Sequence, residues 1–344
     1  AEQLRRALNQ KNQAEMVMDY RERFYQGALA RGVAPEAIEK TWKMIMSFAG
    51  YSFCKPHSAS YAQLSLECAY LKAHYPAEFM AAVISNEGGY YPTLAYLSEA
   101  RRMGFDLLNP DINKSDWKYA ACTGALRVGF MQIAGLKHSL VRQIIAERQS
   151  HGRFQSLQDF CSRLSPEKEQ VALLIKAGCF DSLSQGRTRP GLLWQAYAQG
   201  TNRFNRVPNP DEYSELEKLR YEIETFGLLL SRHPLELYRA AAAGIDAIRA
   251  DEMNHYVGRK IHLLGWLISD KLTQTKTGEP MEFVTFEDES SLYEATLFPG
   301  AYQRFYSLLI PNRPFLLEGR VDDHLGCVTL KLQKIARLDR LAGS

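Results

Sequence analysis

Apolar residues recur at intervals of three and four through the first part of the chain. In residues 35–51, for example, Ile38 and Trp42 fall on one face of a helix. Prolines and glycines divide this part of the chain into separate segments. The pattern predicts a helical region over residues 1–88.

The middle of the chain changes period several times. Residues 90–130 combine a short helix with extended chain and a small hairpin at Thr123-Gly124. Short helical segments return in residues 131–185, and a linker rich in Pro and Asn follows. We therefore expect a helical domain over residues 89–212 and connecting helices over residues 213–256.

From about residue 257 apolar and polar residues alternate. In the last segment of this kind, Val328, Leu330 and Leu332 point one way and the polar residues between them point the other. Five such segments occur, with a helical stretch between the third and the fourth. That order is typical of a five-stranded OB-fold β-barrel, which we predict over residues 257–338. The fold class is therefore a multidomain protein with helical domains followed by a barrel.

Composition narrows the classes of protein that fit this pattern. The 344 residues are 46% hydrophobic, enough for several cores, and carry a net charge of only +3. Contacts with nucleic acid must therefore come from local basic patches. The six cysteines occur singly, without CxxC pairs, and no apolar run is long enough to span a membrane. We expect a cytoplasmic protein with reduced thiols, without zinc or disulfides.

A glycine turn stands directly before a basic helix in residues 131–148. Gly135 lets the backbone take a positive φ, so that neighbouring N–H groups converge on one oxygen atom. The positive end of the following helix adds to this attraction, and Lys137, His138 and Arg142 supply charge. The segment predicts a site for a DNA backbone phosphate that does not read base sequence.

A similar unit occurs about forty residues later. In residues 171–183 a helix is followed by Gly178 in a short turn. Either glycine, taken alone, can be explained as the end of a helix. Two such units in one chain favour the other interpretation, which is a tandem grip on duplex DNA at Gly135 and Gly178.

Two further segments have the residues of an anion site. Residues 4–11 place arginines and a lysine on a helix, and arginine binds phosphate through paired hydrogen bonds. Residues 50–63 place a lysine and a histidine just ahead of a helix, whose N-terminus attracts anions. The plainer alternatives are a solvated helix face and a capped helix entry with a core tyrosine. The candidate anion-binding residues are Arg5, Arg6, Lys11, Lys55, His57, Ser58 and Tyr61.

Residues that would carry out catalysis are not apparent in the sequence. No pair of aspartates stands in a strand context that suits two metal ions. No Ser-His-Asp arrangement and no Walker loop is present. The chain therefore has the features of a binding protein more than those of a catalyst.

Several long stretches match the motifs of one family. FAGYSFCKPHSASYAQLSLECAYLKAHYP, in residues 48–76, is similar to a segment that the family writes FAGYGFNKSHSAAYA followed by YLKAHYP. GLKHSLVRQIIAER and LLIKAGCFDSL resemble its helix-hairpin-helix region, and ELEKLRYEIETFGLLLSRHPLE resembles the stretch before its OB domain. These blocks occur in the family's order. The chain thus resembles the bacterial C-family DNA polymerases, the polymerase III alpha subunits and their error-prone relatives.

The resemblance implies a carboxy-terminal part of a DNA-directed DNA polymerase. It would contain the end of the fingers, a region that binds duplex DNA and the sliding clamp, and an OB domain near single-stranded template. The candidate anion-binding residues would then bind the incoming dNTP. The catalytic aspartates, with two Mg²⁺ ions, would lie in a palm domain upstream of this chain, so the fragment alone would be inactive. Other replisome or mutasome subunits would be partners.

Three departures from the family pattern bear on these roles. The family's RRAMGKK is RRALNQK here, so one lysine of the pair is replaced. The family's KSHS is KPHS, where Pro56 replaces a hydroxyl and stiffens the loop. The clamp-binding Q-x-x-[LM]-F is represented only by QGTNRF, from Gln199 to Phe204, which is one residue longer and lacks the aliphatic anchor. That poor match favours an error-prone or auxiliary polymerase, and the replicative type stays open.

The barrel would contact single-stranded DNA through exposed aromatic and basic residues, because stacking and charge tolerate any base sequence. We expect Trp266, Lys271, Phe286 and Arg320 to make these contacts, unless they face the core instead. The alternative to a polymerase part is a non-catalytic DNA-binding or scaffold module built from the same domains. An RNA-binding protein fits less well, because no stacked-aromatic RNP signature occurs.

Overall fold

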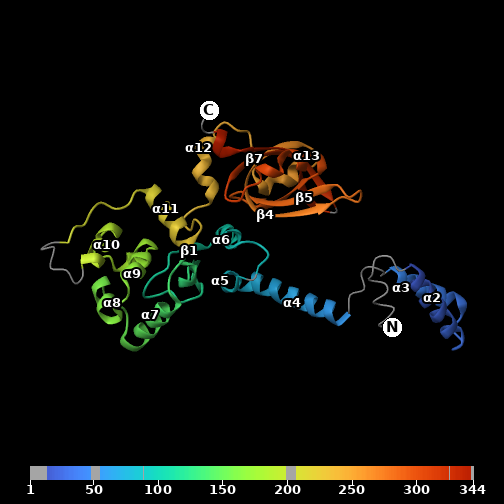
Figure 1. Ribbon diagram of the computed structural model, residues 1–344, viewed down its shortest axis with the longest axis horizontal. Coiled ribbons are helices and arrows are strands. Elements are labelled where there is room, and N and C mark those ends of the chain that lie inside the picture. The colour runs from blue at the N-terminus through green and yellow to red at the C-terminus, as the bar shows by residue number, and fades with distance from the viewer. Residues whose placement is uncertain (1–13, 48–54, 88, 199–206, 325, 342–344) are drawn as a thin grey trace. The chain divides into compact units, whose positions relative to one another are not determined.

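The computed structural model describes residues 14–47, 55–87, 89–198, 207–324 and 326–341 (Figure 1). The chain forms two compact units, Ala1–Ala73 and His74–Ser344. The sequence placed the end of the first helical region at residue 88. The helix that follows His74 buries Met80 and Ile84 in the core of the second unit. The predicted domain limits remain predictions.

The first unit holds α2 (Ala14–Leu29), α3 (Pro35–Ser47) and nearly all of α4 (Lys55–His74). α2 and α3 form a pair, in which the rings of Phe24 and Trp42 lie 5.6 Å apart and Ile38 is buried. The predicted apolar face of α3 is thereby confirmed at Ile38 and Trp42. Large apolar side chains of α4, such as that of Leu66, are exposed. None of the helices in the described residues is both long and apolar enough to cross a lipid bilayer.

The second unit begins with two helices and a small sheet. The helices are α5 (Pro76–Asn86) and α6 (Thr93–Arg102), and the strands are β1 (Asp106–Leu108), β2 (Ala120–Cys122) and β3 (Ala125–Arg127). β2 and β3 are antiparallel, and Gly124 between them has a φ of +68°. The hairpin predicted at Thr123-Gly124 is confirmed.

A group of short helices follows the sheet. They are η1 (Phe130–Gln132), α7 (His138–His151), α8 (Leu157–Leu164), α9 (Lys168–Lys176), η2 (Asp181–Leu183) and α10 (Arg189–Ala198). The rings of Phe154, Phe160 and Phe180 are fully buried at their centre, and successive ring centroids lie 5.1 Å apart. These edge-to-face contacts tie the turn after α7, α8 and the turn after α9 into one core.

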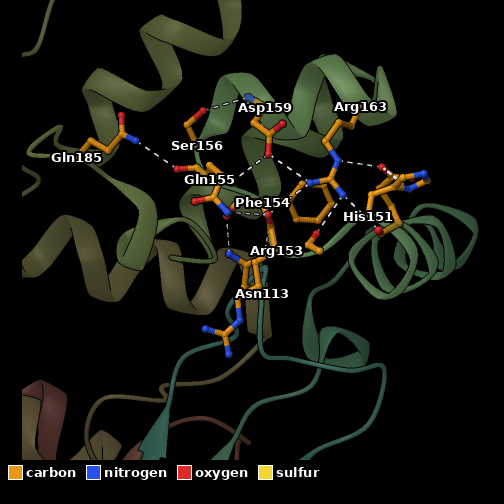
Figure 2. A network of polar contacts seen from close by, with 11 residues as sticks. Asn113, His151, Arg153, Phe154, Gln155, Ser156, Asp159, Arg163 and Gln185 are labelled. Atoms are coloured by element: carbon orange, nitrogen blue, oxygen red, sulfur yellow. Dashed lines mark hydrogen bonds and ion pairs between the residues drawn. The ribbon is translucent and has the colours of Figure 1, made fainter.

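Figure 2 shows how the turn between α7 and α8 is held. The Arg163 guanidinium lies 4.3 Å from the centre of the Phe154 ring and donates hydrogen bonds to a Glu147 carboxylate oxygen (2.8 Å) and to Gly152 O (3.1 Å). The hydrogen bond from Arg163 lowers the pKa of Glu147. The Asn113 amide donates to Phe154 O at 2.8 Å and accepts from Phe154 N at 2.9 Å. These contacts fix α8 against the end of α7.

A further group of helices connects this region to the barrel. It consists of α11 (Glu215–Phe226), η3 (Pro234–Tyr238), α12 (Arg239–Ala242) and η4 (Ala250–Tyr256). α11 starts at a capping box between Ser214 and Glu217. It ends at Gly227, whose φ of +72° is the left-handed conformation that stops a helix.

The remaining strands close into a barrel, drawn in orange and red in Figure 1. They are β4 (Lys260–Gln274), β5 (Pro280–Glu287), β6 (Leu292–Leu297), β7 (Pro314–His324) and β8 (Cys327–Arg337). Between β6 and β7 lie the helices α13 (Pro299–Phe305) and η5 (Tyr306–Leu308), and α14 (Leu338–Leu341) follows β8. The strand order around the barrel is β4-β5-β6-β8-β7, and β6 and β8 are parallel. The predicted five-stranded barrel of OB type is confirmed. A helix stands between its third and fourth strands, as predicted.

One buried carboxylate joins the barrel to the helices of the same unit. Glu287, at the end of β5, is fully buried and accepts a hydrogen bond from the Ser98 hydroxyl at 3.0 Å. Arg102 Nη1 lies 3.5 Å from its other oxygen. His233 Nδ1 accepts the Leu235 N–H, and its Nε2 lies 3.2 Å from Glu287. The same junction buries one apolar cluster made of Ala95, Leu235, Trp266 and Ile268.

A second carboxylate organises the outer surface of the barrel. Lys260, His262 and Lys334 converge on Glu318, with nitrogen–oxygen distances of 2.5, 3.2 and 3.3 Å. Hydrogen bonding, first from Lys260 and then from His262 and Lys334, lowers the pKa of Glu318 to about 2. The folded pKa lies below the unfolded value of about 4.3, so the network stabilises the fold above that pH. Its contribution is lost as pH falls through about 2.

We expect Glu318→Gln to lower the free energy of unfolding by about 1 kcal/mol at pH 7, and by progressively less as pH falls from about 4 towards 2. Urea unfolding of both proteins at several pH values measures this difference. Glu294→Gln is the control, because Glu294 is exposed on β6 and forms no ion pair within the described residues. A difference that stays constant across this pH range would contradict the assignment.

Candidate nucleic-acid interface

The turn between η1 and α7 is anchored on both sides by apolar residues. Ile133 and Leu136 are buried, whereas Gly135 between them is exposed and has a φ of +78°. A side chain at Gly135 would meet only ordinary contact with Leu173, at 3.7 Å. Glycine is therefore required here for its backbone conformation and not for space. The turn stands at the protein surface directly before the N-terminus of α7.

The amide groups of this turn divide into two sets. Ala134 N–H donates to Thr225 O and Lys137 N–H donates to Gln170 Oε1, each at 2.7 Å. Within the described part of the chain, no acceptor is bonded to the N–H groups of Gly135, His138 and Ser139. Three amides at an exposed turn and helix N-terminus are thus available to an anion.

No side chain of α7 itself caps this helix end. Lys137 is the N-cap of α7 and makes no side-chain capping bond, and the first turn contains no acidic residue. The partial positive charge of the helix end is therefore not neutralised by a carboxylate from α7 itself. An anion placed here would meet both the free amides and the helix dipole.

The three predicted cations have different surroundings. Lys137 Nζ lies 2.5 and 2.7 Å from the two carboxylate oxygens of Glu167, so its charge is already paired. The exposed His138 ring stands edge-on to Trp117, with ring centroids 4.4 Å apart. Arg142 is exposed one turn further along α7 and forms no ion pair with the described residues. Arg142 is thus the cation most accessible to a phosphate.

The second predicted turn does not offer its backbone. Gly178 has the predicted positive φ, +80°, but it is buried and its N–H donates to Ile175 O at 2.9 Å. The ion pair of Arg189 with Asp181 stands over it, so that a side chain at Gly178 would collide with the Arg189 guanidinium. The structure therefore corrects the prediction of a DNA-binding amide at Gly178, because this glycine ends α9.

The barrel residues predicted to bind DNA differ in exposure. Phe286 is fully buried in the barrel core, and Trp266 is 8% exposed in the apolar junction with the helices. Both predictions of a stacking platform are wrong, because those rings are already packed. Lys271 and Arg320 are exposed, as the prediction required.

A different aromatic lies beside Lys271. Phe283 is 43% exposed and stands directly opposite Lys271 in the β4–β5 ladder. Tyr90, Asp270 and Glu294 line the same shallow cavity. Because two carboxylates flank this single lysine, a base bound here would be held mainly by stacking. Arg320 lies opposite Lys331 on the β7–β8 ladder, and Lys331 Nζ lies 4.7 Å from the centre of the Phe298 ring.

Comparison with known proteins shows what this chain is similar to. Residues 104–189 match the helix-hairpin-helix motif. DNA polymerase III subunit alpha of Aquifex aeolicus is 31% identical over 339 residues, and the subunits of Thermus aquaticus and Saccharopolyspora erythraea are 32% and 31% identical over 347 and 370 residues. The alignments cover 94 to 96% of this chain. The chain is related to the DNA polymerase III alpha subunit.

The resemblance seen in the sequence is thereby confirmed. This chain spans only 28 to 31% of the length of those polymerase III alpha subunits. The matched helix-hairpin-helix region contains Gly135 and the whole of α7. The exposed turn described above thus lies in the part of this chain that matches the helix-hairpin-helix motif.

The predicted dNTP-binding residues, which were assigned from the resemblance to the polymerase, lie in the first unit. α4 begins at Lys55, so His57, Ser58 and Tyr61 stand within its first two turns and not ahead of it. The rings of His57 and Tyr61 lie 4.6 Å apart edge to face, and Tyr61 is 58% exposed. The plainer alternative of a core tyrosine is therefore wrong.

Several predicted residues lie outside the described residues. These are Arg5, Arg6 and Lys11 of the predicted triphosphate site and Gln199 and Phe204 of the predicted clamp-binding motif.

Two residues beside the candidate sites were not predicted from the sequence. Gln170 was not singled out, although it bonds to both ends of the exposed turn. No local pattern predicts this role, because Gln170 lies 35 residues after Gly135 in the sequence. Strand alternation puts Phe283 and Phe286 on opposite faces, but β5 buries residues of both faces, so the pattern alone did not predict which ring is exposed.

Proposed function

We propose that this chain is the DNA-holding part of a bacterial DNA-directed DNA polymerase, which transfers nucleotides from dNTPs to a primer 3′ end. The observation that carries the proposal is the exposed turn at Gly135, with its free amides at the N-terminus of α7. A phosphate of duplex DNA would accept hydrogen bonds from the Gly135, His138 and Ser139 amides, and Arg142 would add charge. Such contacts position the duplex without reading its sequence.

The barrel would receive single-stranded template. A base would stack on Phe283 beside Lys271, while Arg320 and Lys331 on the other ladder would attract the backbone. Trp266 and Phe286 take no part in this proposal, because both rings are buried.

We expect Phe283→Ala to weaken single-strand binding about tenfold, because one stacked base contributes about 1–3 kcal/mol. Fluorescence anisotropy with a labelled oligothymidine measures the effect. Leu272→Ala is the matched control, since Leu272 is exposed on the same hairpin but has no ring. Equal affinities of the two variants would remove the stacking role from Phe283.

Catalysis belongs, in this proposal, to the parent enzyme. Two Mg²⁺ ions would activate the primer hydroxyl and stabilise the triphosphate, and we place their ligands in a palm region upstream of this chain. In the described residues, no group of three or more His, Cys, Asp or Glu residues is arranged to hold a metal ion. The incoming dNTP would be bound by Arg5, Arg6 and Lys11 together with the α4 residues Lys55, His57, Ser58 and Tyr61.

The partners follow from the same assignment. A sliding clamp would bind near Gln199 and Phe204, and other replisome or mutasome subunits would dock on the polymerase in the cytoplasm. Both the replicative and the error-prone types fit the chain. The weak clamp motif favours a role in translesion synthesis.

Two measurements test the function. Filter binding over a salt series should give duplex affinity that falls steeply with salt, because phosphate contacts release counterions. Joining the chain to an upstream polymerase segment that carries the palm should restore nucleotide incorporation. Duplex binding without any incorporation in the joined protein would favour the alternative, a non-catalytic DNA-binding or scaffold module. No duplex binding at all would reject both.

A further inference from the structure

One buried side-chain amide, that of Gln170, makes two hydrogen bonds to the exposed turn at Gly135. Gln170, in the first turn of α9, is only 6% exposed. Its Oε1 accepts the Lys137 N–H at 2.7 Å, and its Nε2 donates to Gly135 O at 3.1 Å. One side chain thus spans the turn from the residue that bends it to the residue that caps α7.

These two bonds decide which backbone groups face outward. A carbonyl oxygen repels phosphate, and Gln170 turns the carbonyl of Gly135 away from the surface by bonding to it. The opposite side of the turn is held by the bond from Ala134 N–H to Thr225 O on α11. The turn is therefore clamped between two helices that come much later in the chain, with its unbonded amides left outside.

The same helix also carries a group that opposes phosphate binding. Glu167, the N-cap of α9, accepts from Lys137 Nζ with both carboxylate oxygens. Both side chains are more than half exposed, so the pair is weak and a phosphate can replace the carboxylate. Until then Glu167 neutralises Lys137 and places a negative charge beside the site.

We infer that Gln170 is a positioning residue that holds the Gly135 turn in its phosphate-binding conformation, and that Glu167 competes with DNA phosphate for Lys137. The inference rests on the proposed DNA-binding function. It assigns opposite effects to two residues that lie three positions apart on one helix end. A merely structural role for this end of α9 would not separate them.

The experiment measures duplex affinity of the chain and its variants by fluorescence anisotropy at an ionic strength of about 0.1 M. Gln170→Met keeps the size of the side chain but removes both hydrogen bonds, and we expect it to bind about tenfold more weakly. Its Lys137 amide should also lose protection from hydrogen exchange. Glu167→Gln removes the competing charge, and we expect it to bind about threefold more tightly.

Two controls keep the result interpretable. Glu169→Gln makes the same change of charge on the same helical turn, but Glu169 is exposed and pairs with no cation in the described residues, so its effect should be smaller than that of Glu167→Gln. Gln170→Glu retains the acceptor for Lys137 N–H and regains a donor for Gly135 O only when protonated. Its affinity relative to the wild type should therefore recover as pH falls, which a loss of packing would not reproduce.

Wild-type affinity in Gln170→Met and Gln170→Glu, or equal affinities of Glu167→Gln and Glu169→Gln, would overturn this inference while the proposed function stands. Failure of the unmodified chain to bind duplex would instead reject the proposed function, and the inference with it.

Discussion

Replacing Gly135 with valine is expected to weaken duplex binding between about tenfold and a hundredfold while the barrel stays folded. A β-branched residue at a φ of +78° is strained by about 1–3 kcal/mol, and the turn relieves that strain by leaving the conformation that presents its amides. Space is not the cause, since the nearest atom to the added Cβ is Leu173 Cδ1 at 3.7 Å. Anisotropy titrations with a labelled duplex give the affinity, and circular dichroism reports the fold.

The control for this change is Gly124→Val. Gly124 also has a positive φ, +68°, and its added side chain would meet open space in the turn between β2 and β3. The substitution introduces similar strain away from the proposed interface, and duplex affinity should stay near that of the wild type. If both variants bound equally well, the amides at Gly135 would not hold phosphate.

Glu287→Ala is expected to give the largest loss of stability, about 3–5 kcal/mol, because it breaks a buried ion pair. Arg102 would keep only its contact with Glu99, and the Ser98 hydroxyl would lose its acceptor. Glu287 is fully buried, and Arg102 and His233 both face it. Glu287→Gln keeps the shape and can still accept from Ser98, so its loss should be smaller. Urea unfolding followed by circular dichroism measures both differences.

A neighbouring glutamate supplies the comparison. Glu289 is two residues further along the chain and pairs with Arg239 at 2.7 Å, but its side chain is 42% exposed. Glu289→Ala should therefore cost less than about 1 kcal/mol. A loss at Glu287 no larger than that at Glu289 would show that the buried carboxylate does not join the barrel to the helices.

Local pattern was sufficient for the elements and their order. The alternation of Val328, Leu330 and Leu332 with polar residues predicted β8, and the buried face of α3 followed from the spacing of Ile38 and Trp42. Such patterns are read within one element, because the period of a helix or strand is set by its own backbone. The bend at Gly135 could likewise be predicted from the sequence, since a positive φ is a property of a single residue.

Which aromatic residues of the barrel are buried could not be predicted from one strand, because burial depends on contacts with other elements. Strand alternation separates Phe283 from Phe286 but does not say which of the two faces the core. Trp266 belongs to no barrel-core cluster, yet it is buried because Ala95 and Leu235 from earlier helices cover it. An aromatic on a strand is available for stacking only if no other element lies on it, and that depends on residues far away in the sequence.

The sequence by itself determined the helical and barrel segments, the relation to polymerase III alpha subunits, and the position of the bend at Gly135. Only the tertiary structure decided which amides are available. The Gly178 N–H is hydrogen-bonded and covered by Arg189 and Asp181, whereas the Gly135 N–H has no acceptor within the described residues. The physical reason is that a backbone group is free or satisfied according to its neighbours in space. Those neighbours, such as Gln170 and Thr225, are supplied by helices that only packing brings to the turn.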